Sequence, residues 1–248
     1  ERIRYDVRAE MELSHSSLVT EAPLGSQTLV PYLRSPYLYY EAKLAELLAP
    51  ESRVLELGAG SGIHTRAILQ TGAKVIASDI SSSSLSLLRQ RFNNTECDLV
   101  IALADMEKLP FEAKSFDAIV SAGSLSYGDP ELVYAEIRRV LRPGGMLICV
   151  DSLNHNPVYR LNRWLHYLNG NRSISTLKRM PNLTRIRELS SGFSDVCVQY
   201  FGSLSFAMPV VASFFGESSA QSFSDRIDLF IGAKRSAFKF VLVAQGFA

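Results

Sequence analysis

Three glycines at alternate positions, Gly58, Gly60 and Gly62, separate a short apolar stretch from a predicted helix. Glycines in such a loop permit a tight turn and let a ligand approach the backbone closely, and the start of the helix favours a carboxylate. A dinucleotide site would require glycine or alanine at the position of Ile63, and Glu56 stands just before the loop. The pattern therefore favours a different carboxylate-bearing cofactor, with an ordinary strand-to-helix turn as the alternative.

Two further acids end the next two predicted strands. Asp79 lies 23 positions after Glu56, where a carboxylate can accept hydrogen bonds from both hydroxyls of a ribose and would repel a 2′-phosphate. An N-cap of the following helix is an alternative role for Asp79, and the two roles are compatible. Asp105 follows the third strand and could accept a hydrogen bond from the exocyclic amine of an adenine, with Met106 against the base. Taken alone, Asp105 is also typical of an ordinary loop.

The elements that must position these acids alternate between strands and helices. Short apolar runs predict strands, and segments with capping or turn signals predict helices. Regular alternation with short connections predicts an α/β fold, in which helices cover both faces of a parallel sheet and ligands bind beyond the carboxyl ends of the strands. The predicted strands are residues 53–57, 74–78, 98–103, 116–121 and 146–150, and the predicted helices are residues 37–48, 62–71, 82–92 and 130–141.

After Asp151 the alternation breaks. Residues 154–191 are predicted to be helical, and two late strands at 196–206 and 238–247 are predicted to form an antiparallel edge pair. Residues 196–216 carry no charge, but polar residues and Pro209 interrupt the run. A strand followed by an apolar turn is therefore favoured over a membrane span.

One ordered set of motifs carries a family resemblance. The glycine loop and Asp79 are followed by Asp-x-x-x-Leu-Pro-Phe at 105–111, Ser-Phe-Asp at 115–117 and Leu-Arg-Pro-Gly-Gly at 141–145. In this order the motifs resemble class I S-adenosylmethionine-dependent methyltransferases of the small-molecule, type 11-like kind. The resemblance implies a Rossmann-like, doubly wound, seven-stranded, mostly parallel sheet whose last strand is antiparallel, with a helical insert or lid. It also implies S-adenosyl-L-methionine as cofactor and S-adenosyl-L-homocysteine as product.

The resemblance further implies which residues bind the cofactor. The glycines would line its methionine moiety, and Glu56 would orient the amine, usually through water. Asp79 would hold the ribose, Asp105 and Met106 the adenine, and Ser121 would lie beneath the sulfonium. The complete set of implied cofactor-binding residues is Glu56, Gly58, Gly60, Gly62, Asp79, Ile80, Asp105, Met106 and Ser121.

The predicted organisation is a core with attached segments. Residues 1–36 are expected to form an amino-terminal lid, and residues 37–151 the S-adenosylmethionine-binding core. Residues 152–194 are expected to form a helical insert on the substrate side. Residues 195–248 would supply the C-terminal strands of the same domain, with a helical excursion at 207–236.

Catalytic residues must lie at the carboxyl ends of the strands. Methyl transfer is an in-line displacement, so alignment of the acceptor with the methyl group can supply much of the acceleration. An oxygen acceptor also benefits from a base. His155, after the fifth strand, is the best candidate base because histidine titrates near neutral pH. Tyr127, after the fourth strand, is a second catalytic candidate, and a hydrogen-bonded loop histidine is the alternative for His155.

The insert mixes cations, aromatic residues and amides. Such a mixture can bind an anionic or sugar-like substrate, and it can also contact a membrane surface or RNA. Part of it is also explained as the solvated face of a helix. Residues 154–181 weakly resemble methyltransferases from bacterial surface-glycan and natural-product gene sets. We therefore expect a small-molecule acceptor, with an oxygen of a sugar, glycan-lipid or natural-product intermediate favoured. N- or C-methylation, and a cofactor-binding homologue that does not methylate, are the alternatives.

The composition argues against several other classes of protein and of binding site. The 26 basic and 25 acidic residues give a formal net charge of +1, which argues against a nucleic-acid partner held by phosphate charge. Cys97, Cys149 and Cys197 lie far apart without metal-ligand spacing, so we expect no metal site and a reducing compartment. Residues 1–12 are charged throughout and do not resemble a signal peptide, so a cytoplasmic protein is expected.

Overall fold

The computed structural model describes residues 6, 24–93, 97–168, 178–231 and 234–248, which contain one seven-stranded sheet. The strand pairs from β3 through β5 are parallel, and β7 is antiparallel to both of its neighbours. The predicted α/β class, with a mostly parallel sheet and an antiparallel last strand, is confirmed. The order across the sheet is β3 (Leu99–Leu103), β2 (Lys74–Asp79), β1 (Arg53–Leu57), β4 (Phe116–Ala122), β5 (Leu141–Ser152), β7 (Lys239–Phe247) and β6 (Phe193–Phe201).

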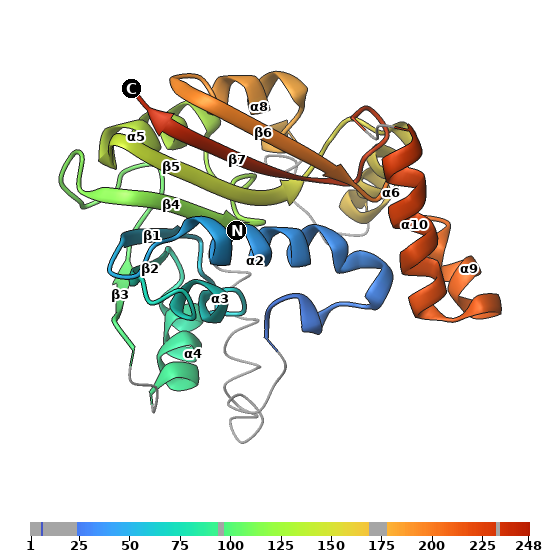
Figure 1. Ribbon diagram of the computed structural model, residues 1–248, viewed down its shortest axis with the longest axis horizontal. Coiled ribbons are helices and arrows are strands. Elements are labelled where there is room, and N and C mark those ends of the chain that lie inside the picture. Colours follow the sequence, from blue (N-terminus) through green and yellow to red (C-terminus); the bar gives the residue numbers. More distant parts are fainter. Residues whose placement is uncertain (1–5, 7–23, 94–96, 169–177, 232–233) are drawn as a thin grey trace.

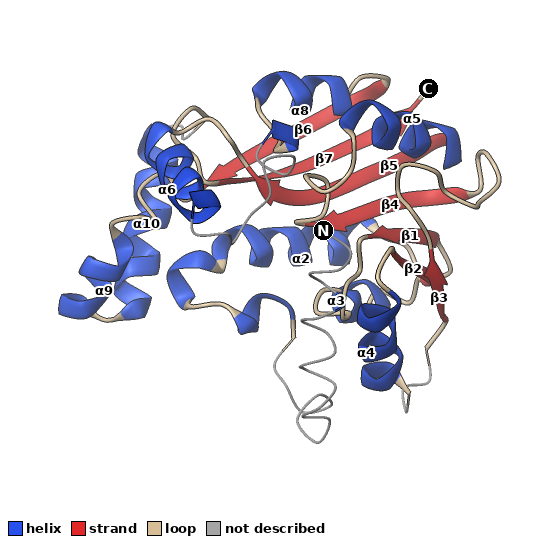
Figure 2. Cartoon of the chain, turned by 180° about the vertical axis from the view of Figure 1, so that it is seen from behind, coloured by secondary structure: helices blue, strands red, loops and turns tan. Residues whose placement is uncertain are grey.

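Alternate side chains of the strands enter two separate apolar cores, because residues two apart share a face of a sheet. In β1, Val54 lies in one core, and Leu55 and Leu57 lie in the other. In β5, Leu147 joins the core of Leu55, and Ile148 joins that of Val54. Helices cover both faces, with α2 (Ser35–Leu47), α3 (Thr65–Leu69) and α4 (Ser82–Phe92) on one, and α5 (Pro130–Val140) and α8 (Leu183–Leu189) on the other (Figures 1 and 2).

Side-chain caps fix where the helices behind the site begin. Ser81 accepts a hydrogen bond from the backbone N–H of Ser84 and starts α4, whose bounds match the predicted helix at 82–92. Asp129 accepts a hydrogen bond from the N–H of Glu131, and Pro130 occupies the first position of α5. These helices therefore start directly after the loops that leave the carboxyl ends of β2 and β4.

Two elements differ from their predicted bounds. The helix after the glycine loop was predicted over 62–71, but α3 is shorter because the chain turns through residues 61–64 before it becomes helical. The fifth strand was predicted to begin at Met146 after a turn. Instead, β5 begins at Leu141, which pairs with Phe116, and the register shifts before Ala118 pairs with Met146. The Pro-Gly-Gly sequence is thus accommodated as an irregularity of the strand.

The late strands are confirmed, with β6 displaced from the predicted 196–206. Beyond Phe201, the N–H groups of Gly202 and Ser203 donate to the carboxylate of Asp228 at 2.5 and 2.9 Å, instead of extending the sheet. Gly202 has a φ of +76°, which suits glycine. The helical excursion between the two strands forms α9 (Met208–Phe215) and α10 (Glu217–Ile231).

The attached segments are described in part. Of the predicted lid, Asp6 and residues 24–36 are described, and the rest lies outside the described residues. The short helices η2 (Gly25–Thr28) and η3 (Pro31–Leu33) belong to this segment, and the N–H of Gly25 donates to the carbonyl of Ile63 at 2.7 Å. In the insert, α6 (Pro157–Leu168) precedes residues 169–177, which lie outside the described residues.

No helix in the described ranges combines the length and the apolar character that crossing a membrane requires.

We expect Phe240→Ala to lower the free energy of unfolding by about 3–5 kcal/mol, because the ring is fully buried in the strand that joins β5 to β6. Phe214→Ala is the matched control. Phe214 is 78% exposed on α9, so its loss should cost less than about 0.5 kcal/mol. Urea unfolding followed by fluorescence measures both values, and equal losses would contradict the central place of β7 in the core.

Candidate functional site

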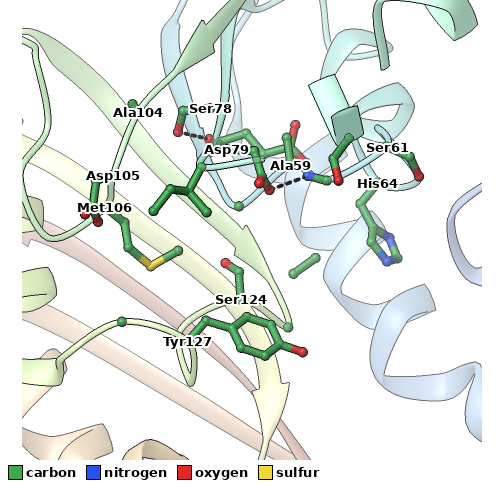
Figure 3. A pocket seen from close by; sticks show the side chains of 18 of the residues that line it. Ala59, Ser61, His64, Ser78, Asp79, Ala104, Asp105, Met106, Ser124 and Tyr127 are labelled. Carbon is green, nitrogen blue, oxygen red and sulfur yellow. Dashed lines mark hydrogen bonds between the residues drawn. The ribbon is translucent and has the colours of Figure 1, made fainter. Parts of the chain in front are cut away.

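A cavity of about 520 Å³ lies at the carboxyl ends of β1, β2 and β4 and beside the loop after β3. This volume is within the range of about 300–1,000 Å³ that is typical of small-molecule sites. Figure 3 shows Asp79 between two groups of residues, with Asp105 and Met106 on one side and Ser61 and His64 on the other. Ser124 and Tyr127 border the cavity from the loop after β4. The sheet edge therefore brings together residues from four loops, as an α/β fold predicts.

Asp79, at the end of β2, lines the cavity and also fixes the backbone of two neighbouring loops. Its Oδ2 accepts a hydrogen bond from the N–H of Gly60 at 2.8 Å, and its Oδ1 accepts one from the N–H of Ser81 at 2.9 Å. Burial raises the pKa of the Asp79 carboxyl, while these two hydrogen bonds act in the opposite direction. The carboxylate thus joins the glycine loop after β1 to the start of α4.

Glu56, in β1, forms a buried polar end of the cavity. Its side chain is 2% exposed, and Oε2 accepts a hydrogen bond from Thr65 Oγ1 at 2.7 Å. Burial raises the pKa of Glu56 to about 7, although the Thr65 hydrogen bond opposes that shift. Glu56 is therefore poised to ionise near neutral pH, and a cationic group beside it would favour the charged form.

The three glycines have different physical roles. Gly60 lines the cavity with a φ of +55°, and a Cβ added there would meet nothing within 4 Å. Gly58 also lines the cavity, but a Cβ there would lie 2.3 Å from Cβ of Ser124. Gly62 is absent from the lining. A Cβ on Gly62 would lie 2.9 Å from side-chain atoms of Leu88 and Phe92. Because glycine has no Cβ, α4 can pack closely against the loop at this position.

The residues predicted for adenine lie together at one end. Ile80, Asp105 and Met106 all line the cavity. Asp105 Oδ1 accepts a hydrogen bond from the N–H of Glu107 at 2.9 Å, which fixes the loop after β3. The Met106 side chain reaches toward the glycine loop, since its Cε would lie 3.6 Å from a Cβ on Gly58. An apolar thioether beside a carboxylate suits a flat base with an exocyclic amine.

His64 lines the opposite end and was not among the predicted site residues. Its ring stacks on Tyr37, with centroids 4.9 Å apart and planes 6° from parallel, and meets Tyr40 edge-on. Burial, with a smaller effect of Lys239, lowers the pKa of His64 to about 4, so the ring is neutral at pH 7. Its buried Nδ1 has no hydrogen-bond partner among the described residues. The sequence signal that could have identified His64 is its position two residues after the last glycine of the loop.

Arg179 enters the cavity from the insert. Its Nη1 donates to the backbone carbonyl of Tyr127 at 3.1 Å and lies 3.6 Å from Glu107 Oε1. Tyr127 and Arg179 both line the cavity, so this wall combines a phenol with a cation. No sequence motif singled out Arg179, because its neighbours along the chain give no sign that it returns to the glycine-loop side of the sheet.

Besides Gly62, two more of the predicted site residues lie outside the lining of the cavity. Ser121 is fully buried in β4, where its hydroxyl lies 2.7 Å from that of Ser124, and Ser124 lines the cavity in its place. His155 is half-buried on the chain after β5 and is not among the residues that line the cavity. The cofactor-binding role of Ser121 and the catalytic role of His155 therefore stay predictions.

The residues present fit S-adenosylmethionine. Gly60 leaves open space where a bound molecule would meet the backbone, and His64 Nδ1 is a buried polar atom that a polar ligand group can satisfy. Asp79 offers carboxylate oxygens midway between these groups and Met106 (Figure 3). The amino-acid, ribose and adenine parts of the molecule would thus each have a suitable surface.

The central part of the chain matches a known family. Residues 55–149 match the family model described as a methyltransferase domain. An uncharacterized methyltransferase of Mycobacterium bovis is 34% identical over 140 residues, which are 56% of this chain and 52% of that protein. Demethylmenaquinone methyltransferase of Clavibacter sepedonicus is 36% identical over 110 residues, which are 44% of each chain. The match spans about half the length of these curated relatives.

A solved structure shows the same fold over most of the chain. Phosphoethanolamine N-methyltransferase 2 of Haemonchus contortus, in complex with phosphomonomethylethanolamine and S-adenosylhomocysteine, superposes with a TM-score of 0.60. The identity is 19%, and the superposition covers 85% of this chain and 52% of that one. The family match shows that residues 55–149 of the chain are a methyltransferase domain, and the solved structure shows that its fold is shared over most of the chain.

Proposed function

We propose that this protein transfers the methyl group of S-adenosylmethionine to a small-molecule acceptor. The observation that carries the proposal is that Glu56, Asp79 and Asp105, from three different strand ends, line one cavity. When bound, the cofactor supplies an electrophilic methyl group on a sulfonium. Glu56 and His64 would hold its amino-acid end, Asp79 its ribose, and the Asp105 loop its adenine.

The protein's own contribution to transfer is alignment. An acceptor must approach with a lone pair or carbanion aimed at the methyl carbon, and fixed positioning supplies much of the acceleration. Tyr127 and Arg179 line the cavity and can orient an acceptor. A guanidinium can hold an anionic or oxygen-rich group by two parallel hydrogen bonds. This supports an oxygen of a sugar, glycan-lipid or natural-product intermediate as the acceptor.

An amine or carbon acceptor is the second candidate. It is favoured by the absence of His155 from the residues that line the cavity, since such acceptors do not depend on that base. The relatives named above include a methyltransferase of demethylmenaquinone and an N-methyltransferase of phosphoethanolamine. Comparing glycosides, amines and quinols as acceptors, with S-adenosylhomocysteine formation as the readout, separates the two candidates. A protein that binds the cofactor but yields no S-adenosylhomocysteine with any acceptor would contradict both.

The amino-terminal segment, residues 1–36, is proposed to act as a lid. The carboxylate of Asp6 accepts a hydrogen bond from Ser81 Oγ at 2.5 Å, close to Asp79. At its other described end, Ser26 donates from both N–H and hydroxyl to the carboxylate of Glu41, at 2.7 and 2.8 Å. These contacts fix Asp6 next to the start of α4 and Ser26 against α2, and a lid that closed over the cavity would exclude water.

We expect Asp79→Asn to weaken S-adenosylhomocysteine binding by about tenfold to a hundredfold. An amide has one acceptor oxygen, so it cannot serve Gly60, Ser81 and a ribose as the carboxylate does. Isothermal titration calorimetry measures the affinity, and Asp98→Asn, an exposed acid before β3, is the control. Unchanged affinity in Asp79→Asn would contradict its place at the ribose.

Binding of S-adenosylhomocysteine should release a proton near pH 6.5. Glu56 has a raised pKa of about 7 in the free protein, so it is largely protonated at that pH. The ammonium of the ligand favours the carboxylate and lowers that pKa, so the proton leaves. Calorimetry in two buffers of different ionisation enthalpy measures the release, and Glu56→Gln should remove it. Equal release in the Gln variant would assign the proton to another group.

Tyr127→Phe should lower kcat/KM by about tenfold to a hundredfold, the value of a lost hydrogen bond to a reacting or bound group. His155→Gln should lower it by less than about threefold, because His155 does not line the cavity. Both variants should keep their affinity for S-adenosylhomocysteine. The opposite order of losses would restore His155 as the base.

A further inference from the structure

The α9–α10 hairpin exposes apolar side chains that the proposed function does not use. Phe214 is 78% exposed on α9, and Leu229 and Phe230 are 78% and 91% exposed near the end of α10. Figures 1 and 2 both show the two helices side by side, projecting from the body of the protein. We define the hairpin surface as the exposed apolar residues of both helices, which are Val210, Phe214, Phe215, Phe223, Leu229 and Phe230.

The exposure follows from how α10 packs. Its inward face carries Ala220, Ser224 and Asp228, which are buried, four residues apart and directed at the rest of the protein. Asp228 is fixed there by the N–H groups of Gly202 and Ser203. Phe223 and Phe230 lie two turns apart on a different side of the helix, so rotating the helix to bury them would break these contacts. The packing of α10 therefore leaves large apolar side chains exposed on the surface of the protein.

The charges around this surface are strongly biased. Between β6 and β7 the described cations Arg226, Lys234 and Arg235 are all exposed. Of the three acids in that segment, Asp228 is buried and Asp225 is half-buried beside Ser35, which leaves Glu217 as the exposed carboxylate. Exposed aromatic and aliphatic side chains bordered by lysine and arginine are the pattern of a helix that lies in the interface of an anionic bilayer.

The hairpin leaves the sheet at the edge that carries the cavity. It connects Phe201 at the end of β6 with Lys239 at the start of β7, and Lys239 pairs with Ser152 at the carboxyl end of β5. We propose that the hairpin surface docks the protein on a lipid bilayer that contains anionic lipids, with the cavity edge of the sheet on the docked side. This contact is distinct from any contact made by the insert, and it does not depend on the identity of the acceptor.

A second copy of the chain fits this surface less well. In a two-fold symmetric dimer the same patch faces itself, so Arg226, Lys234 and Arg235 of one copy would approach the same cations of the other. Like charges across an interface oppose association, whereas anionic head groups neutralise them. The charge pattern thus favours a bilayer over self-association.

The test is co-sedimentation of the 248-residue chain with vesicles of phosphatidylcholine, alone or with about a third phosphatidylserine. We expect binding to the anionic vesicles, weakened at least about tenfold in the double variant Phe214→Ser/Phe230→Ser. Lys234→Gln/Arg235→Gln should also lower binding to the anionic vesicles by about tenfold and should reduce its dependence on salt. Leu132→Ser, which removes a half-exposed leucine from α5, is the matched control and should bind as the unmodified chain does.

Cofactor affinity separates docking from folding and from the proposed function. None of the substituted residues lines the cavity, so all variants should bind S-adenosylhomocysteine equally. Absence of binding to anionic vesicles by the unmodified chain would overturn the proposal, as would equal binding by Phe214→Ser/Phe230→Ser. Sedimentation velocity gives a third outcome that overturns it, namely a dimer that dissociates in the double variant without any vesicle binding.

Discussion

The half-buried carboxylate of Asp79 makes the contacts on which the rest of the site depends. It joins the N–H of Gly60, in the loop after β1, to the N–H of Ser81, at the start of α4. Both backbone groups would lose a partner without it, and an unpaired buried N–H is costly. The same oxygens face the cavity. One side chain therefore fixes the backbone of two loops and also lines the cavity, so the geometry of the loops and the chemistry of the cavity cannot vary independently.

Burial is the second constraint, and it controls the charge of Glu56 and His64 in the wall of the cavity. It raises the pKa of Glu56 to about 7 and lowers that of His64 to about 4, so both shifts disfavour a charged group. The stacked ring of Tyr37 and the edge of Tyr40 supply much of the apolar surface around His64. This wall is thus polar but weakly charged until a ligand brings its own charges.

Most of the sheet and the acid side of the site were predictable from sequence. Strands buried on both faces are short apolar runs, and β1 and α4 have the bounds that were predicted for them. Glu56, Asp79 and Asp105 were found because each lies at or just after the carboxyl end of such a run. Arg179 and His64 were not, because their placement depends on tertiary packing of the insert and of α2. Gly62 was assigned to the ligand, whereas its neighbours Leu88 and Phe92 explain it by packing. Local sequence patterns predict the residues at strand ends well, but they predict long-range contacts poorly.

The insertion of β7 between β5 and β6 has a consequence for how the protein is made. A ribosome delivers β6 before the whole α9–α10 hairpin and before β7, yet β6 pairs only with β7 in the sheet that the structure describes. Until β7 emerges, β5 has an open edge and β6 has no partner. The nascent chain therefore passes through a stage with two unpaired strand edges and an apolar hairpin in water, the condition in which chains aggregate or recruit chaperones.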